Sequence, residues 1–189
     1  MARRPPAVPA QVLRRAASVR LVALDVDGVL TDGRLYFGAR GEALKAFDVR
    51  DGLGLRWLQD AGIEVAIITG RRSGIVAARA RDLGIRRVLQ GQRDKHASLQ
   101  RVLRQTGLAP QDCAFMGDDF PDLAVLGAVG LATTVADAPE ELRRSVHWVA
   151  PSPGGRGAVR DLAGLILRAQ GRYEDLLAAA HGTGERRHG

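Results

Sequence analysis

Short apolar runs alternate with longer amphipathic runs along most of this chain, and the alternation restricts the folds open to it. Such a pattern is typical of βαβ units, in which a helix returns the chain to the start of the next parallel strand. The expected strands are Leu21–Leu24, Glu64–Ile68, Arg87–Leu89, Ala114–Met116, Gly130–Ala132 and His147–Val149. The expected helices are Gly52–Ala61, Ser73–Leu83, Lys95–Thr106, Asp119–Leu126, Pro139–Ser145 and Val159–Ala169. Since most of the strands are apolar throughout, the sequence predicts an α/β fold whose doubly wound, mostly parallel sheet is covered on both faces.

One segment interrupts the alternation directly after the first strand. Residues Arg34–Phe37 and Ala43–Phe47 are joined by the turn-rich GARGE and predict a β-hairpin. We expect one domain over residues 17–171, preceded by a tail over residues 1–16 that runs into a short helix. A flexible tail is expected over residues 172–189, where the chain becomes polar and rich in glycine and arginine.

Composition restricts the class of protein. The 189 residues carry a formal net charge of +7, and Lys45 and Lys95 are the only lysines among the basic side chains. The arginines are scattered and aromatic residues make up 4% of the chain, so we expect no nucleic-acid partner, whereas an anionic small substrate needs only a few arginines. A single cysteine, Cys113, allows no internal disulfide, and no apolar run approaches the roughly 20 residues that span a bilayer. We therefore expect a cytoplasmic protein without a membrane partner.

Carboxylates follow two of the expected strands. Asp25 and Asp27 come directly after the first strand, and Asp118, Asp119 and Asp122 follow the fourth. The carboxyl ends of parallel strands meet at one edge of a sheet, so these side chains should gather there. Each carboxylate raises the cost of ionising its neighbours, and the cluster therefore needs a cation. Oxygen ligands without cysteine or clustered histidine favour Mg²⁺.

Groups suited to phosphate fall at the same edge of the sheet. Mg²⁺ in proteins commonly shares its coordination shell with a substrate phosphate. Gly28, Gly70 and Gly117 let backbone N–H groups come close to an anion, Thr69 adds a hydroxyl and an amide, and Lys95 adds a positive charge at a helix start. Since an aspartate can attack phosphorus and form an aspartyl-phosphate, the set favours phosphoryl transfer.

Four short motifs resemble those of the haloacid dehalogenase superfamily of aspartate-nucleophile phosphatases, which has a Rossmann-like fold: DVDGVLTDG, TGR, Lys95 and GDDFPD. The resemblance implies that Asp25 is the catalytic nucleophile and Asp27 the general acid and base. It also implies that Thr69 binds phosphate and that Lys95 orients both the nucleophile and the phosphate.

The same resemblance implies a metal site. Its ligands would be Asp25, Asp118 and the backbone carbonyl of Asp27, with Asp122 as a supporting carboxylate. Carbon–halogen hydrolases of this superfamily lack an acid at the second aspartate, whereas an alkoxide leaving group needs a proton. Asp27 therefore favours phosphate-ester hydrolysis.

A narrower resemblance covers the chain from about Ala17 to Gln170. The chain is similar to the small phosphatases of this superfamily that act on 3-deoxy-D-manno-octulosonate 8-phosphate (KDO 8-phosphate) and lack a cap domain. The shared motifs are LDVDGVLTDG, LKAFDVRDGLG, EVAIITGR, QGQRDK, GDDFPDL and GGRGAVRD. This resemblance implies a Mg²⁺-dependent hydrolase of lipopolysaccharide synthesis. It also implies a homotetramer in which the hairpins meet at the centre and a neighbouring subunit closes each site.

The substrate implied by this resemblance is a sugar phosphate that also carries a carboxylate, which guanidinium groups bind well. The candidate substrate contacts are Asp27, Thr69, Gly70, Arg71, Arg79 and Lys95. Arg156 and Arg160 are candidates to reach in from a neighbouring subunit. Two alternatives stay open, namely a phosphatase for a related acid sugar phosphate such as N-acylneuraminate 9-phosphate, and a catalytically silent scaffold with this fold.

Overall fold

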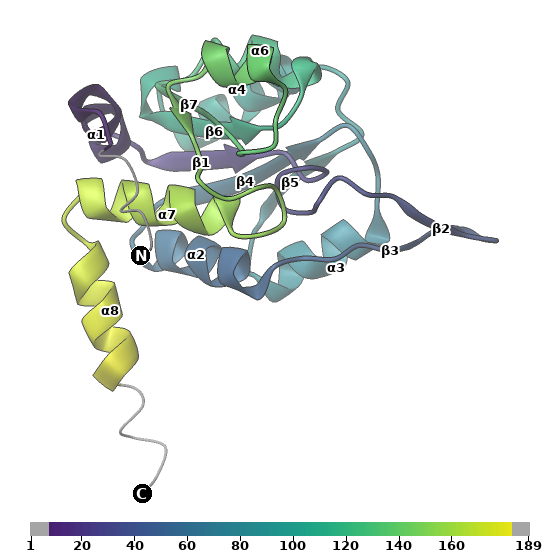
Figure 1. The fold of residues 1–189 in the computed structure, drawn as a ribbon, viewed down its shortest axis with the longest axis horizontal. Helices are drawn as coiled ribbons and strands as arrows, with labels where there is room; N and C mark the ends of the chain where they lie inside the picture. The colour runs from purple at the N-terminus through teal and green to yellow at the C-terminus, as the bar shows by residue number, and fades with distance from the viewer. Residues whose placement is uncertain (1–7, 183–189) are drawn as a thin grey trace, which may run out of the picture.

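A six-stranded sheet forms the centre of the computed structural model, which describes residues 8–182 (Figure 1). Its strands are β1 (Leu21–Leu24), β4 (Glu64–Thr69), β5 (Arg87–Gln90), β6 (Cys113–Gly117), β7 (Leu131–Thr134) and β8 (Trp148–Val149). They lie in the order β5-β4-β1-β6-β7-β8, and every neighbouring pair is parallel. The predicted α/β fold with a mostly parallel sheet is confirmed.

The direction of winding reverses at β1. From β1 the chain passes to β4 and β5 on one side, then crosses to β6, β7 and β8 on the other. In open α/β sheets, ligands bind beyond the carboxyl ends of the strands at such a reversal. Asp25 and Asp118, the first residues after β1 and β6, therefore stand at the expected binding position.

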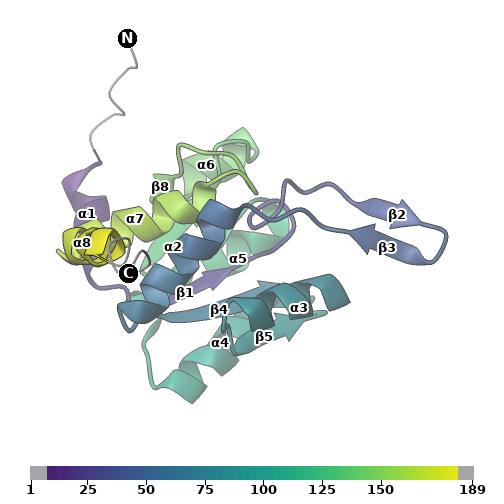
Figure 2. The same ribbon diagram turned by 90° about the horizontal axis from the view of Figure 1, so that it is seen from below.

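Helices cover both faces of the sheet (Figures 1 and 2). On one face lie α2 (Val49–Asp60), α3 (Gly74–Asp82) and α7 (Ala158–Ala169), and on the other lie α4 (Lys95–Thr106), α5 (Leu123–Leu126) and α6 (Glu140–Ser145). None of the helices within residues 8–182 has the length and apolar character needed to cross a membrane.

The ends of two predicted helices differ from the structure. α2 begins at Val49 and not at Gly52, because the Asp48 side chain accepts a hydrogen bond from the Arg50 backbone N–H and caps an earlier start. The helix expected over residues 119–126 is divided into a 3₁₀ turn (Phe120–Asp122) and the short α5.

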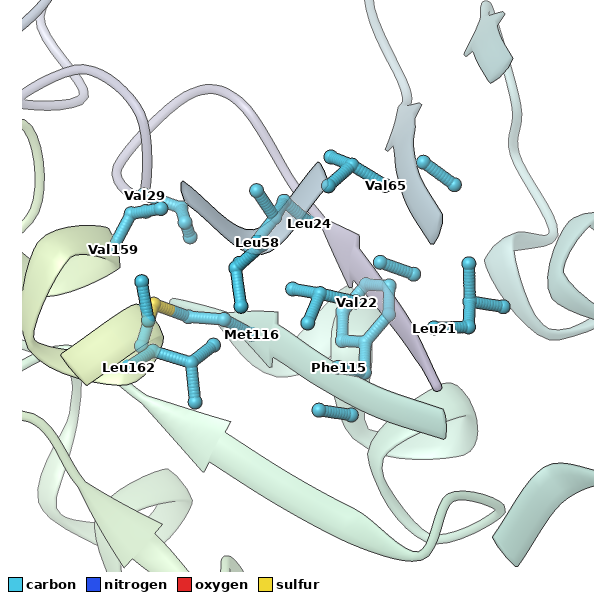
Figure 3. Close-up of a cluster of buried hydrophobic side chains, with 14 of the residues drawn as sticks. Leu21, Val22, Leu24, Val29, Leu58, Val65, Phe115, Met116, Val159 and Leu162 are labelled. Atoms are coloured by element: carbon cyan, nitrogen blue, oxygen red, sulfur yellow. The ribbon is translucent and has the colours of Figure 1, made fainter. Parts of the chain in front are cut away.

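The hydrophobic core lies on both faces of the central strands. Val22 and Leu24 of β1, Phe115 and Met116 of β6 and Leu162 of α7 are fully buried in it (Figure 3). Burying a side chain of this size stabilises the fold by about 1.5–3 kcal/mol. The strands that end at the aspartates are thus held rigidly by packing on both faces.

The predicted hairpin is present and projects from the body of the protein (Figure 2). Its strands, β2 (Tyr36–Gly38) and β3 (Gly41–Leu44), are antiparallel and shorter than expected. A register shift between Tyr36 and Phe37 interrupts the pairing near the start of β2, and the chain leaves β3 at the buried Lys45. The hairpin exposes apolar side chains, among which Phe37 is 62% exposed.

Two helices fall in segments that the sequence assigns to tails. α1 (Ala10–Ala17) buries Val12 and Ala16 and packs along α7. α8 (Tyr173–Gly182) sets the ring of Tyr173 edge-on against Trp57, with the ring centroids 5.7 Å apart. α1 is the short helix expected at the end of the N-terminal tail, whereas α8 corrects the flexible tail predicted over residues 172–189 as far as Gly182. Residues 1–7 and 183–189 lie outside the described part of the chain.

Candidate active site

A cleft at the carboxyl ends of the central strands contains all four motifs. Asp25 follows β1, Thr69 ends β4, Lys95 begins α4 and Asp118 follows β6, and all four line the cleft together with Asp27. Asp25, Thr69 and Lys95 are buried, whereas Asp27 and Asp118 are partly exposed. The structure therefore brings together residues that lie up to 93 positions apart, from Asp25 to Asp118 (118 − 25).

Lys95 joins two of the carboxylates. Its Nζ lies 2.7 Å from Asp25 Oδ2 and 2.6 Å from Asp122 Oδ1. Asp94 caps α4 by accepting a hydrogen bond from the Ala97 backbone N–H at 2.8 Å, which fixes the helix start that carries Lys95. Burial disfavours the ammonium, yet the charges of Asp25 and Asp122 outweigh burial and raise the pKa of Lys95. Lys95 is therefore a fixed positive charge within the cluster.

One lysine does not neutralise the cluster. Burial is the main reason that the pKa of Asp25 is raised, and the charge of Asp122 raises it further. Burial, with the charges of Asp25 and Asp122, raises the pKa of Asp118 to about 7. Carboxyl groups whose ionisation is this costly at neutral pH need another cation.

The residues present fit a magnesium ion. Carboxylate oxygens of Asp25, Asp118 and Asp122 lie within 4.8 Å of one another. Asp25 Oδ1 is buried and has no hydrogen-bond partner among residues 8–182, so it is available to a cation. Both oxygens of Asp122 are occupied, because Oδ1 accepts from Lys95 and Oδ2 accepts from the Asp118 backbone N–H at 3.1 Å. Asp122 thus supports the cluster, while Asp25 and Asp118 have the oxygens that Mg²⁺ prefers.

Comparison with known proteins identifies similar hydrolases and phosphatases. A family model described as haloacid dehalogenase-like hydrolase matches residues 42–130. The KDO 8-phosphate phosphatase KdsC of Yersinia pestis is 48% identical over 163 residues, which cover 86% of this chain and 87% of that protein. KdsC of Escherichia coli K12 is 46% identical over 168 residues, or 89% of each chain. The chain belongs to the KDO 8-phosphate phosphatase family.

Solved structures of the family share the whole fold. The crystal structure of the Yersinia pestis phosphatase has a TM-score of 0.86 and 47% identity, over 87% of this chain and 89% of that one. The phosphatase of Moraxella catarrhalis has a TM-score of 0.87 and 40% identity, over 89% and 97% of the two chains. That structure contains a magnesium ion, a phosphate ion and a KDO molecule.

Two glycines of the family motifs make room for carboxylates. A Cβ on Gly28, whose φ is +85°, would lie 1.9 Å from Asp118 Oδ2, and a Cβ on Gly117 would lie 2.4 Å from Asp122 Oδ2. Around Gly70 there is space, since the nearest atom to an added Cβ is 3.7 Å away. The sequence predicts these glycines from close approach to an anion. The structure adds a second reason, because Gly28 lets the first motif approach Asp118 of the fourth, and Gly117 makes room for Asp122 within the fourth motif.

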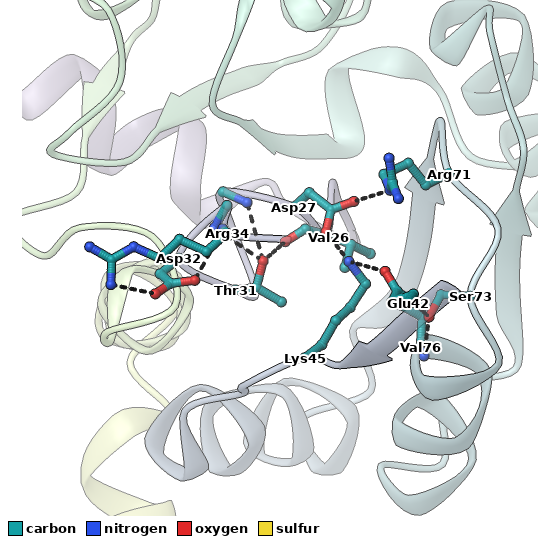
Figure 4. A network of polar contacts seen from close by, with 12 residues as sticks. Val26, Asp27, Thr31, Asp32, Arg34, Glu42, Lys45, Arg71, Ser73 and Val76 are labelled. Carbon is teal, nitrogen blue, oxygen red and sulfur yellow. Dashed lines mark hydrogen bonds and ion pairs between the residues drawn. The ribbon is translucent and has the colours of Figure 1, made fainter. Parts of the chain in front are cut away.

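The hairpin contributes a residue that the sequence prediction missed. Lys45 donates a hydrogen bond to Asp27 Oδ1, while Arg71 Nε lies 3.7 Å from Asp27 Oδ2 (Figure 4). Lys45 also pairs with Glu42, whose Oε1 lies 3.0 Å from Nζ. The only sequence signal for this role is that Lys45 is one of two lysines in a chain otherwise supplied with arginine.

The predicted arginines lie in different places, and not all of them line the cleft. Arg71 lines the cleft, and so does Arg93, which the sequence prediction missed. Arg79 pairs with Asp82 on α3 at 2.6 Å, and the Arg160 guanidinium lies 3.9 Å from the ring centroid of Trp57. Within a single described chain, Arg79, Arg156 and Arg160 therefore do not line the cleft.

Proposed function

We propose that this protein hydrolyses KDO 8-phosphate to KDO and inorganic phosphate, with Mg²⁺ as cofactor, in lipopolysaccharide synthesis in the cytoplasm. The observation that carries the proposal is the buried Asp25, with one oxygen held by Lys95 and the other without a partner among residues 8–182. The relatives that are 46–48% identical over most of the chain bear the name of this activity. Residues 17–171 would form the catalytic unit, and its one cysteine suits a reducing compartment.

The proposed reaction has two chemical steps. Asp25 attacks phosphorus, so that a bond forms between its carboxylate oxygen and phosphorus while the ester P–O bond breaks, and Asp27 gives a proton to the leaving alkoxide. Asp27 then takes a proton from the water that attacks the aspartyl-phosphate, which releases phosphate and restores Asp25. Magnesium, held by Asp25, Asp118 and the backbone carbonyl of Asp27, would neutralise charge on the phosphate oxygens.

The remaining cleft residues would bind the substrate. Thr69 is buried at the end of β4 and can donate its hydroxyl and amide to a phosphate oxygen, next to the open backbone of Gly70. Lys95 keeps its charge beside Asp25 and would balance the phosphate as the new bond forms. Arg71 lines the cleft with its side chain 44% exposed, which suits the binding of a carboxylate on the incoming sugar.

Magnesium affinity should rise with pH up to about 7. A protonated Asp118 offers no ligand, and its pKa is raised to about 7 by burial and by Asp25 and Asp122. Proton and metal compete below that pH, so the affinity should fall about tenfold per pH unit on acidification and level off above pH 7. Calorimetric titration of Mg²⁺ into the protein from about pH 5.5 to pH 8.5 measures this. Asp118→Asn should bind weakly and with a shallower slope, since only Asp25 then competes for a proton, and equal wild-type affinity at both ends of the range would contradict the assignment.

We also propose that the protein is a homotetramer whose hairpins meet and whose neighbouring subunits help to close each cleft. Four apolar side chains of the hairpin segment are exposed, namely Leu35, Tyr36, Phe37 and Leu44, which is typical of an interaction surface. Phe37→Glu should give a smaller species in size-exclusion chromatography with light scattering and lower kcat/KM for the sugar phosphate about tenfold or more. Leu13→Glu, at an exposed position of α1, should stay tetrameric, and a monomeric wild type would contradict the proposal.

Phosphate release from a panel of esters tests the function directly. The panel contains KDO 8-phosphate, N-acylneuraminate 9-phosphate and arabinose 5-phosphate, each assayed with and without Mg²⁺. The highest kcat/KM is expected for KDO 8-phosphate. Preference for N-acylneuraminate 9-phosphate would assign the protein to a related acid sugar phosphate, and no turnover of any ester would favour a silent scaffold.

A further inference from the structure

The chain's two lysines occupy matching positions beside the two aspartates that follow β1. Lys95 lies between Asp25 and Asp122, and Lys45 lies between Asp27 and Glu42. Apart from these two lysines, the chain uses arginine wherever it has Lys or Arg. An ammonium is a compact charge that fits between two carboxylates, whereas a planar guanidinium needs more room. Lysine therefore suits both places.

The ammonium of Lys45 lies between the carboxylates of Asp27 and Glu42 (Figure 4). The side chain of Lys45 is only 1% exposed, and its Nζ donates to Asp27 Oδ1 while lying 3.0 Å from Glu42 Oε1. Lys45 is not one of the residues that line the cleft within the described chain. Its contact with Asp27 is therefore the route by which it would act on a bound substrate.

Glu42 is anchored in turn to the body of the protein. Its Oε2 accepts a hydrogen bond from Ser73 Oγ, and Ser73 begins α3 by accepting from the Val76 backbone N–H at 3.4 Å. The Ser73 backbone N–H donates to Gln90 Oε1 at 2.6 Å. A chain of polar contacts thus runs from α3 and β5 through the hairpin to Asp27, and it fixes the position of Lys45.

Among the described residues, no other charged side chain lies as close to the Asp27 carboxylate as Lys45. The side chain of Asp27 is 20% exposed, and the other cation near it, Arg71, is 3.7 Å away with a side chain that is 44% exposed. A general acid must stay within hydrogen-bond reach of the oxygen that it protonates. Lys45 supplies the fixed contact that restricts rotation of this carboxyl group.

We propose that Lys45 is a positioning residue that holds the Asp27 carboxyl group in the orientation from which it protonates the leaving oxygen. The inference rests on the proposed role of Asp27 as general acid. When the ester P–O bond breaks, the leaving alkoxide takes the proton of Asp27, and Lys45 then lies beside the carboxylate that forms. Glu42 and Ser73 keep the ammonium in place throughout.

The leaving group of the substrate provides a test. Expulsion of an alkoxide needs a proton, whereas 4-nitrophenolate leaves without one, and kcat/KM excludes the later hydrolysis of the aspartyl-phosphate. Lys45→Met, which keeps the length of the side chain and removes its charge, should lower kcat/KM about 10²-fold for KDO 8-phosphate and less than about threefold for 4-nitrophenyl phosphate. An equal fall on both esters, or no fall on the alkyl ester, would overturn the proposal.

Three further variants define the comparison. Asp27→Asn should show the same selective loss with a larger magnitude, and Arg104→Met, which removes a charge from the exposed last turn of α4, should leave both esters unaffected. If Lys45→Met does not fold, Glu42→Gln combined with Lys45→Met removes one charge of each sign and must show the same selectivity. Wild-type turnover of KDO 8-phosphate decides the proposed function separately. If another alkyl phosphate of the panel is the substrate, that ester replaces KDO 8-phosphate and the comparison still decides on Lys45.

Discussion

Asp25→Asn should lower phosphate release by at least about 10⁴-fold while the protein stays folded. An amide cannot attack phosphorus, so no aspartyl-phosphate forms, and its NH₂ group would repel a cation at the position of the unpartnered Oδ1. Turnover is measured as inorganic phosphate released from KDO 8-phosphate at saturating Mg²⁺. Full activity in this variant would contradict the proposed mechanism.

The stability of the same variant separates catalysis from folding. Burial and the charge of Asp122 raise the pKa of Asp25, so the ionised carboxylate is costly in the folded protein. Lys95 keeps Asp122 as a partner when Asp25 becomes neutral. The urea midpoint of Asp25→Asn should therefore equal or exceed that of the wild type. Asp32→Asn is the matched control, because its side chain lies in the same loop and can still accept from the Arg34 backbone N–H, and it should keep full activity.

The parallel sheet and the carboxylate cluster could be predicted because both follow from local sequence. Buried parallel strands are apolar throughout, and the burial of all four β1 residues agrees with the pattern read from Leu21–Leu24. The cluster needed one more rule, that the strands end at the same edge of the sheet. Asp25, Thr69 and Asp118 are then neighbours whatever the lengths of the connecting helices.

Contacts made by the hairpin could not be predicted in the same way. The position of Lys45 depends on how β2 and β3 leave the sheet and on the anchoring of Glu42 by Ser73, which lies 31 residues further along the chain. The arginines show the same difficulty. Arg79 lies over the ring of Phe47, and Arg160 lies over the ring of Trp57. A sequence motif does not show which residues a long, flexible side chain contacts.

The late motif GGRGAVRD acquires a physical explanation only from the structure. Gly155, with φ of +62°, donates its backbone N–H to the Val29 carbonyl at 2.9 Å, and Gly154 donates to Asp137 Oδ1 at 2.9 Å. A Cβ on Gly154 would lie 1.8 Å from the Gly28 carbonyl oxygen. The loop that carries Asp27 therefore rests directly on the backbone of these two glycines.

Gly154→Ala should damage both stability and activity. The added Cβ would collide with backbone atoms of Gly28 and Thr31, which cannot move as a side chain can by changing rotamer, so the loop from residue 26 to residue 32 must shift. Overpacking of this kind should lower the free energy of unfolding by about 3 kcal/mol. A displacement of about 1 Å at Asp27 should lower kcat for KDO 8-phosphate by up to about 10²-fold in the molecules that stay folded.

Gly74→Ala is the matched control for this variant. An added Cβ on Gly74 meets no atom within 4 Å, and its φ is not in the left-handed region. The change should leave activity intact and stabilise the protein by up to about 1 kcal/mol, since alanine restricts the unfolded chain. Urea unfolding and steady-state kinetics of the two variants compare their stability and their activity. If Gly154→Ala unfolded at the wild-type midpoint and kept wild-type kcat, the late glycines would not be the support on which the loop that carries Asp27 depends.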